Sequence, residues 1–275
     1  MGEGLGAGGA DRGHGLLGRG TGGVGVVVDG DAGGAGLGEI ARDQAAEVLG
    51  AAGIAVHYNS DATRAAAEET VAAVRAAGAE AFAQQGDLTR PAEVAALFDA
   101  ALARFGKIDI AVNTTGMVIK KPLIEVSEAE YDRMFAVNSK AAFFFIQEAG
   151  KKLADDGNIC TIVSSLLAAY TPYYAVYPGS KAPIEHFTRA ASKEFGARGI
   201  SVNAVGPGPM DTPFFYPAES QESAAYHATA AALSGRTKSG LTEIQDIAPL
   251  VRFLVGEGWW ITGQTIFANG GYTTR

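Results

Sequence analysis

Asn158-Ile-Cys-Thr-Ile-Val163 is a mostly apolar, β-branched run that ends directly at two hydroxyl side chains, Ser164 and Ser165. The run predicts a buried strand with the two serines at its carboxyl end. A helical stretch containing Tyr177-Pro-Gly-Ser-Lys181 follows, and then a second apolar strand at residues 201–205. A strand, a helix and a strand in succession predict two parallel strands joined by a crossover helix.

The same alternation continues toward the amino terminus. Strands are expected at 24–28, 54–58, 79–84 and 108–113, with helices at 39–49, 62–77 and 91–105. Ser127-Glu-Ala-Glu130 has the spacing of a capping box, which should begin the long helix that carries Asn138. The pattern predicts an α/β, Rossmann-like fold, in which helices cover both faces of a doubly wound parallel sheet and ligands bind at the carboxyl ends of the strands.

Length and composition are consistent with one folded domain. The chain has 275 residues, 47% of them hydrophobic, which is enough to form the core of a single α/β domain over residues 24–275. Residues 1–23 have glycine at nearly every second or third position and lack the apolar core of a signal peptide. We expect this segment to be disordered.

Charge and residue counts exclude several classes of function. A formal net charge of −8 argues against nucleic acid as a partner. No apolar run approaches the ~20 residues needed to span a membrane, so we expect a cytoplasmic protein. The single cysteine, Cys160, excludes a disulfide framework, and the four histidines lack metal-ligand spacing, so no metal site is expected.

Tyr177 and Lys181 are four residues apart, which places both side chains on one face of a helix. A free tyrosine has a pKa of about 10 and is a poor acid at neutral pH, but a neighbouring ammonium favours the phenolate and lowers that pKa. Pro178 and Pro183 bracket the pair, and Pro183 is expected to bend or loosen the helix after Lys181.

From about Val24 to its end, the chain resembles the short-chain dehydrogenase/reductase family. The resemblance extends to four further motifs: Gly86-Asp87-Leu88-Thr89, Asn113-Thr114-Thr115-Gly116, Asn203-Ala-Val-Gly-Pro-Gly-Pro-Met-Asp-Thr212 and Ile261-Thr-Gly-Gln-Thr-Ile-Phe-Ala-Asn-Gly-Gly271. It implies an oxidoreductase that interconverts a small carbonyl compound and an alcohol by hydride transfer. A 3-oxoacyl-thioester reductase is an alternative within the family, and a cofactor-poor binding or regulatory protein is an alternative outside enzymology.

The resemblance implies roles for four catalytic residues. Tyr177 is the general acid or base, Lys181 lowers its pKa and binds the nicotinamide ribose, and Asn138 holds a water that links Lys181 to solvent. A serine fixes the substrate oxygen. Counting thirteen residues back from Tyr177 selects Ser164, whereas the strand-end pattern selects Ser165, which we favour.

The resemblance also implies a cofactor site. The pyrophosphate would lie on a glycine turn after the first strand, in one register Gly30, Gly34 and Gly36 and in another Gly36 and Gly38. Asp87 and Leu88 would meet the adenine. The late loop would face the nicotinamide through Pro207, Gly208, Met210 and Thr212. The turn after the fourth strand would contact the cofactor through Asn113 and Gly116.

The end of the second strand decides between the two cofactors. An acid there would accept from the ribose 2′-OH of NAD and repel the extra phosphate of NADP. The strand ends instead in His57-Tyr58-Asn59-Ser60, and Arg64 follows one turn later. We therefore expect NADP(H) to be favoured over NAD(H), with Asn59 and Ser60 near the 2′-phosphate.

Aromatic residues suggest a substrate pocket and an assembly. Two aromatic groups flank the predicted site, Phe214-Phe-Tyr216 after the late loop and Tyr170, Tyr173 and Tyr174 before Tyr177. They either line a pocket for a flat or apolar carbonyl compound or pack within the protein. Ala141-Ala-Phe-Phe-Phe-Ile146 places bulky apolar residues on more than one helix face. Because relatives commonly form tetramers through this helix, we expect a homotetramer, unless the helix is buried on all sides within one subunit.

Overall fold

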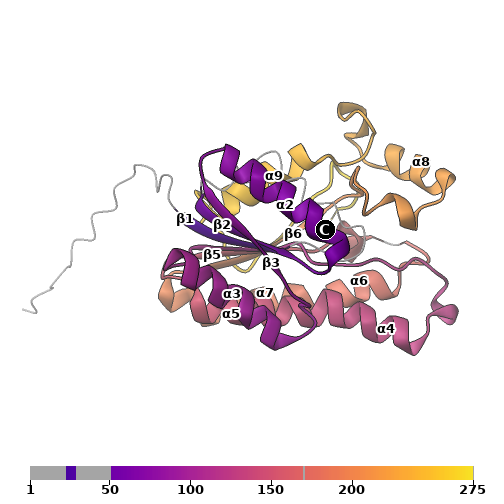
Figure 1. Cartoon of the computed structure of the whole chain (residues 1–275). Helices are drawn as coiled ribbons and strands as arrows, with labels where there is room; N and C mark the ends of the chain where they lie inside the picture. Colours follow the sequence, from indigo (N-terminus) through magenta and orange to yellow (C-terminus); the bar gives the residue numbers. More distant parts are fainter. Residues whose placement is uncertain (1–22, 29–50, 170, 275) are drawn as a thin grey trace, which may run out of the picture.

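The computed structural model describes residues 23–28, 51–169 and 171–274, which form a seven-stranded parallel sheet between two layers of helices (Figure 1). The strand order is β3-β2-β1-β4-β5-β6-β7, and every pairing is parallel. The strands are β1 (Gly23–Val28), β2 (Ala51–Tyr58), β3 (Glu80–Gln85), β4 (Ile110–Asn113), β5 (Asn158–Ile162), β6 (Ser201–Pro207) and β7 (Thr265–Ala268). This topology confirms the predicted doubly wound α/β fold.

The helices divide between the two faces of the sheet. The longer ones are α2 (Asp61–Ala76), α3 (Pro91–Phe105), α4 (Glu128–Phe135), α5 (Ala141–Lys152), α6 (Val176–Lys181), α7 (Pro183–Glu194), α8 (Gln221–Ala230) and α9 (Ile244–Leu254). Apolar residues of α2 and α9 pack on one face, and those of α3, α5 and α7 on the other (Figure 1). The predicted helix 39–49 lies outside the described residues.

The sheet is covered by apolar side chains on both faces. On the face of α3 and α5, Phe98 and Phe145 are fully buried with their rings 5.2 Å apart. Burying a side chain of this size stabilises the fold by roughly 1.5–3 kcal/mol. Phe143, two residues before Phe145 on the outer side of α5, stays 42% exposed, so α5 is not buried on all sides.

The capping box at Ser127 is present as predicted. The Ser127 side chain accepts from the Glu130 N–H, and the Glu130 carboxylate accepts from the Ser127 N–H at 2.9 Å. The helix that begins there does not continue as a regular α-helix, because Ala136–Lys140 forms a π-helical turn before α5. Such turns are frequent at functional sites, and this one carries Asn138.

Pro183 divides the helix that contains the Tyr–Lys pair, as the sequence predicted. The first segment, α6, ends at Lys181, and Pro183 opens α7. Ala182 between them keeps helical backbone angles and donates its N–H to the Pro178 carbonyl. Proline has no N–H to continue the ladder, so the interruption falls after Lys181 and leaves the Tyr–Lys turn intact.

None of the described helices combines the length and the apolar character that crossing a membrane requires.

Candidate active site

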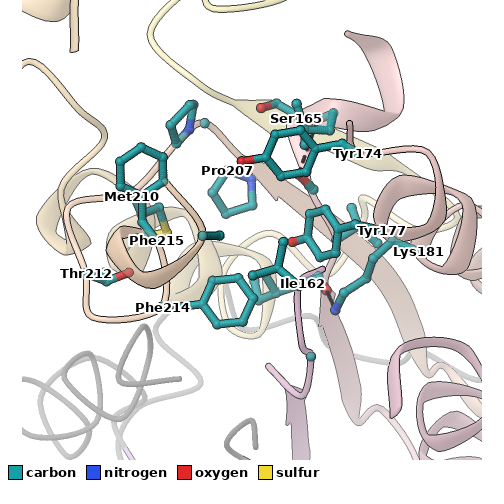
Figure 2. Close-up of a pocket in the computed structure, with 18 of the residues that line it drawn as sticks. Ile162, Ser165, Tyr174, Tyr177, Lys181, Pro207, Met210, Thr212, Phe214 and Phe215 are labelled. Carbon is teal, nitrogen blue, oxygen red and sulfur yellow. Dashed lines mark hydrogen bonds between the residues drawn. The ribbon is translucent and has the colours of Figure 1, made fainter. Parts of the chain in front are cut away.

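A cavity opens at the carboxyl ends of β4, β5 and β6, where the fold predicts a ligand site. It encloses roughly 940 Å³, part of it open to solvent. Figure 2 shows Ser165, Tyr174, Tyr177 and Lys181 on one side and Met210, Phe214 and Phe215 facing them across Pro207. Side chains from segments far apart in the sequence therefore line one space.

Tyr177 and Lys181 lie together in the wall of this cavity, and both are almost completely buried. Burial raises the pKa of Tyr177 to about 12, although a hydrogen bond from Ser164 acts in the opposite direction. Burial lowers the pKa of Lys181 to about 7. Its ammonium donates to the carbonyls of Thr115 and Ile162, at 2.8 and 3.0 Å.

The expectation that Lys181 lowers the pKa of Tyr177 is therefore not met in this structure. Loss of water around the phenol outweighs the other influences on it, and the lysine is directed to backbone carbonyls. The result is a tyrosine that keeps its proton at neutral pH and a lysine that titrates near neutrality.

Asn138 is fully buried and connects the π-helical turn to the turn after β4. Its side-chain oxygen accepts from the Met117 N–H at 2.8 Å, and its amide donates to the Met117 carbonyl at 3.0 Å and to the Ser180 hydroxyl at 2.9 Å. A Cβ atom at Gly116 would lie 2.9 Å from the Lys181 Nζ and 3.3 Å from the Asn138 oxygen. Gly116 thus allows both side chains to approach the backbone.

The two serines after β5 have different surroundings. The Ser164 hydroxyl hydrogen-bonds Tyr177 and accepts from the Leu166 N–H at 3.2 Å. Ser165 begins a short 3₁₀ turn, Ser165–Ala168, and is 1% exposed. Both line the cavity, but Ser164 is the one in contact with Tyr177, whereas the strand-end pattern favoured Ser165.

The loop after β6 forms the opposite wall, and Pro207, Gly208, Met210 and Thr212 all line the cavity. Backbone hydrogen bonds of 2.9 Å from Thr242 to Pro209 and from Asp211 to Thr242 fix this loop. A Cβ atom at Gly208 would lie 2.6 Å from the Thr242 hydroxyl, so glycine is needed for this close approach. The loop and Tyr177 thus lie on opposite sides of the cavity.

The other predicted cofactor residues lie at neighbouring strand ends. The Asp87 carboxylate accepts from the Thr89 N–H at 3.0 Å and from its hydroxyl at 2.6 Å, which orders the turn before α3. Leu88 is buried in the core, so its backbone alone can face a ligand. Asn113 accepts from the Thr115 N–H at 2.9 Å and so shapes the turn that leads to Gly116.

Asn59 and Ser60 follow β2 directly and precede the amino terminus of α2. Arg64, one turn into α2, lies over the Tyr58 ring and forms an exposed ion pair of 3.0 Å with Asp61. These residues offer a cation and neutral hydrogen-bonding groups at the strand end. The two candidate glycine registers, Gly30, Gly34, Gly36 and Gly38, lie outside the described residues.

The aromatic residues that the sequence marked divide into two groups. Tyr174, Phe214 and Phe215 line the cavity, and the Tyr177 ring lies 6.4 Å from both the Tyr174 and the Phe214 rings. Tyr173 is 54% exposed and Tyr216 47% exposed, while Tyr170 lies outside the described residues.

Sequence reasoning missed a polar cluster at the edge of the cavity. Glu219 accepts hydrogen bonds from Lys120, Tyr174 and Ser223, and His227 lies beside it. Lys120 and Glu219 are 99 residues apart, and no local pattern connects them. Across the described residues, no group of histidine, cysteine or acidic side chains is arranged to hold a metal ion.

Comparisons with known proteins agree with the fold. A family model described as enoyl-(acyl carrier protein) reductase matches residues 35–273. A short-chain dehydrogenase/reductase of Aspergillus novofumigatus, nsrJ, is 37% identical over 233 residues, which cover 79% of this chain and 85% of that protein.

Two solved structures extend the comparison. A dehydrogenase structure from Burkholderia cenocepacia with bound NADP has 64% identity and a TM-score of 0.88, and covers 94% of this chain and 97% of its own. The landomycin C-6 ketoreductase LanV, with bound NADP and rabelomycin, has 30% identity and a TM-score of 0.75, and covers 92% and 96%. The chain therefore belongs to the short-chain dehydrogenase/reductase family and is an NAD(P)-dependent oxidoreductase.

Proposed function

We propose that this protein is an NADP(H)-dependent carbonyl reductase that interconverts a ketone or aldehyde and its alcohol. The observation that carries the proposal is the buried Tyr177–Lys181 pair in the wall of an aromatic cavity. An acid at this point can protonate a carbonyl oxygen as hydride reaches the carbonyl carbon. The related ketoreductase with bound NADP and rabelomycin supports a carbonyl substrate.

Tyr177 is the proton donor in the direction of reduction. With its pKa raised to about 12, the phenol holds its proton at neutral pH until negative charge develops on the substrate oxygen. The reduced nicotinamide, when bound, supplies the hydride. The carbonyl then gains the hydride at carbon and the phenolic proton at oxygen, which leaves an alcohol and a phenolate.

Lys181 returns a proton to Tyr177, and Asn138 fixes the geometry of the site. A lysine with a pKa of about 7 can return a proton toward Tyr177 near neutral pH. Asn138 holds the turn at Met117, beside Gly116 and Lys181, and is a positioning residue. We assign Ser164, which contacts Tyr177, to orient the substrate oxygen.

NADP(H) is the preferred cofactor in this proposal. Asn59 and Ser60 leave the end of β2 without a carboxylate, and Arg64 is within one turn. Arg64 is exposed and its partner Asp61 is more exposed still, so the ion pair costs little to exchange for a phosphate. The 64% identical relative with bound NADP supports this preference.

Two measurements test the proposal together. Titration of NADPH and NADH into the protein, followed by nicotinamide fluorescence, should show tighter binding of NADPH. A panel of aryl and alkyl ketones and 3-oxoacyl thioesters, followed by NADPH oxidation, identifies the substrate class. The thioester reductase alternative requires the thioesters to be preferred. A protein that binds neither nucleotide would support the cofactor-poor alternative and contradict the proposal.

We also assign a homotetramer with two-fold axes, in which α5 contributes an interface. Phe143 is 42% exposed and packs edge to face on Phe187 of α7, with ring centroids 5.2 Å apart. These rings form an apolar surface across α5 and α7. Phe145, which also lies in the apolar run of α5, is fully buried against Phe98 and belongs to the core.

Light scattering of the unmodified protein and of Phe143→Glu tests the assembly. The expected result is a tetramer for the former and smaller species for the latter, with an unchanged circular dichroism spectrum. Phe145→Glu should unfold the chain instead, because it places a charge in the core. A monomer at micromolar concentration for the unmodified protein contradicts the assembly and leaves the enzyme proposal standing.

A further inference from the structure

Glu219 is a buried carboxylate in the wall of an otherwise largely apolar cavity. Its side chain is 1% exposed and lies between the 3₁₀ turn Tyr216–Ala218 and α8. It accepts from the Tyr174 hydroxyl, the Ser223 hydroxyl and the Lys120 ammonium. The lysine neutralises its charge, so Glu219 does not need a cationic ligand. A carboxylate has about four acceptor positions. Lys120 and Ser223 both bond Oε2 and Tyr174 bonds Oε1, so the remaining position is on Oε1.

His227 of α8 lies beside Glu219 in the same wall. It is 5% exposed, and burial lowers its pKa, so the ring is neutral at physiological pH. Its Nδ1 lies 3.2 Å from the Tyr272 hydroxyl, which itself hydrogen-bonds Thr171. If Tyr272 donates to Nδ1, the neutral ring carries its proton on Nε2 and presents an N–H donor.

The Nε2 atom lies 3.8 Å from the nearer Glu219 oxygen, which is too long for a direct hydrogen bond. The Nε2 donor and the open acceptor position on Oε1 thus lie on neighbouring groups that do not bond each other. The surrounding surface is apolar, with the Phe215 ring 5.7 Å from the His227 ring. A hydroxyl group is both donor and acceptor, is neutral, and can bond to both groups at once.

We propose that Glu219 and His227 form a binding site for a hydroxyl group of the substrate, remote from the carbonyl that reacts. The Tyr174 side chain separates the two sites, since its hydroxyl bonds Glu219 while its ring lies 6.4 Å from the Tyr177 ring. The substrate is then a flat, apolar ring ketone that also carries a hydroxyl. A carboxylate in that position has no proton to donate to Glu219. The inference rests on the proposed function for its carbonyl chemistry.

Calorimetric titration of ketones into the protein saturated with NADP⁺ tests the site without turnover, because the oxidised cofactor has no hydride to give. The probes are α-tetralone and its monohydroxy isomers. At least one isomer should bind about tenfold to a hundredfold more tightly than the parent ketone, as expected when two buried polar groups gain a partner. Equal affinity for the parent and all isomers, or no binding of any, overturns the inference.

Variants assign the preference to His227. His227→Phe keeps a flat ring without nitrogens and should abolish the preference, whereas His227→Gln keeps an N–H donor and should retain part of it. Glu222→Gln changes an exposed carboxylate on the same helix and should bind the whole ketone series as the unmodified protein does. A similar loss of affinity for parent and hydroxylated ketones in His227→Phe would indicate a structural role and contradict the proposal.

A second readout separates this inference from the proposed function. NADPH oxidation is measured with the same ketones. Preferential binding of a hydroxylated isomer without any turnover refutes the carbonyl reductase and supports the hydroxyl site. Turnover of the parent and the isomers with equal efficiency and equal affinity supports the carbonyl reductase and refutes the hydroxyl site. If thermal melting shows that His227→Phe does not fold, the test uses the unmodified protein and His227→Gln. A preference for a hydroxylated ketone in the unmodified protein that is weaker in His227→Gln supports the proposal, and a preference that is unchanged in His227→Gln contradicts it.

Discussion

The two walls of the cavity are built in opposite ways. In α6, four of six residues are buried, and they include Tyr177, Ser180 and Lys181. In α8, the ten-residue helix on the other side, His227 is the one buried residue, and Tyr226 is 65% exposed. The first wall is packed in an apolar cluster with Met134 and Tyr174, whereas the second is held largely by hydrogen bonds through Glu219 and Tyr272.

The difference indicates that the two walls have different roles in the reaction. Groups that move protons must stay within hydrogen-bond reach of one another, and burial in a packed wall holds them there. Segments with few buried apolar contacts open at lower free energy than the core. Changes in the α6 wall should therefore affect turnover, and changes in residues 210–230, which contain α8, should affect substrate affinity.

The largest effect is expected from Tyr177→Phe, which removes the proton donor and keeps the ring. General acid catalysis contributes about 10²- to 10⁴-fold, so kcat should fall by at least the lower figure. NADPH affinity, measured by fluorescence, should stay within a few-fold. A variant that turns over normally would show that the α6 wall does not carry the chemistry.

The second effect is on stability and comes from Lys181, whose folded-state pKa of about 7 lies below its usual value of 10.5. Above pH 7 the folded chain loses a proton that the unfolded chain still holds, so stability should rise with pH. At about 1.4 kcal/mol per pH unit, the gain from pH 7 to 9 is roughly 2–3 kcal/mol.

Urea unfolding at the two pH values, for the unmodified protein and for Lys181→Met, measures this gain. The variant should lack it, because no lysine is buried at that position. Tyr177 titrates outside this window, since its pKa is raised to about 12. The same rise in both proteins would show that Lys181 is not the group responsible.

A smaller effect is expected from Phe214→Ala in the opposite wall. The Phe214 ring faces Tyr177 with centroids 6.4 Å apart, and its loss removes apolar contact with the substrate. A loss of about 1–2 kcal/mol should raise KM roughly tenfold and leave kcat within a few-fold. Phe253→Ala, an exposed residue of α9, is the control. A fall in kcat with unchanged KM would contradict the division of tasks between the walls.

The smallest change in the reaction itself is expected from Asn59→Asp, which lies outside both walls. A carboxylate at the end of β2 repels a 2′-phosphate, so the ratio of NADPH to NADH affinity should fall several-fold. Asn59→Ser, which adds no charge, should keep the preference. Substrate KM should not change in either variant. An unmodified protein that prefers NADH would refute the cofactor assignment.

The regular strands and helices of the fold were predictable from the sequence. Periodic apolar residues indicated the strands and helices of the described part, and Ser127 with Glu130 indicated where a long helix begins. Tyr177 and Lys181 were found because helix geometry brings residues four apart together. The two glycine registers remain predictions.

The features that the sequence did not reveal depend on long-range packing. The choice between Ser164 and Ser165 depends on one irregular turn, in which a single residue reverses the side-chain direction. The raised pKa of Tyr177 results from burial by several segments, and spacing alone cannot report burial. Lys120, Glu219 and His227 meet only after the loop before α4 and residues 210–230 have folded over the sheet.

The π-helical turn at Ala136–Lys140 sets the rotation of α4 relative to α5. Each residue advances a helix by about 100°, so a π turn accommodates one additional residue and rotates everything that precedes it relative to everything that follows. Met134 before the turn and Phe145 after it are both fully buried, though in different clusters. A one-residue deletion here would bring one of these two faces out of phase with its partner, so the bulge couples the tyrosine wall to the core of the sheet.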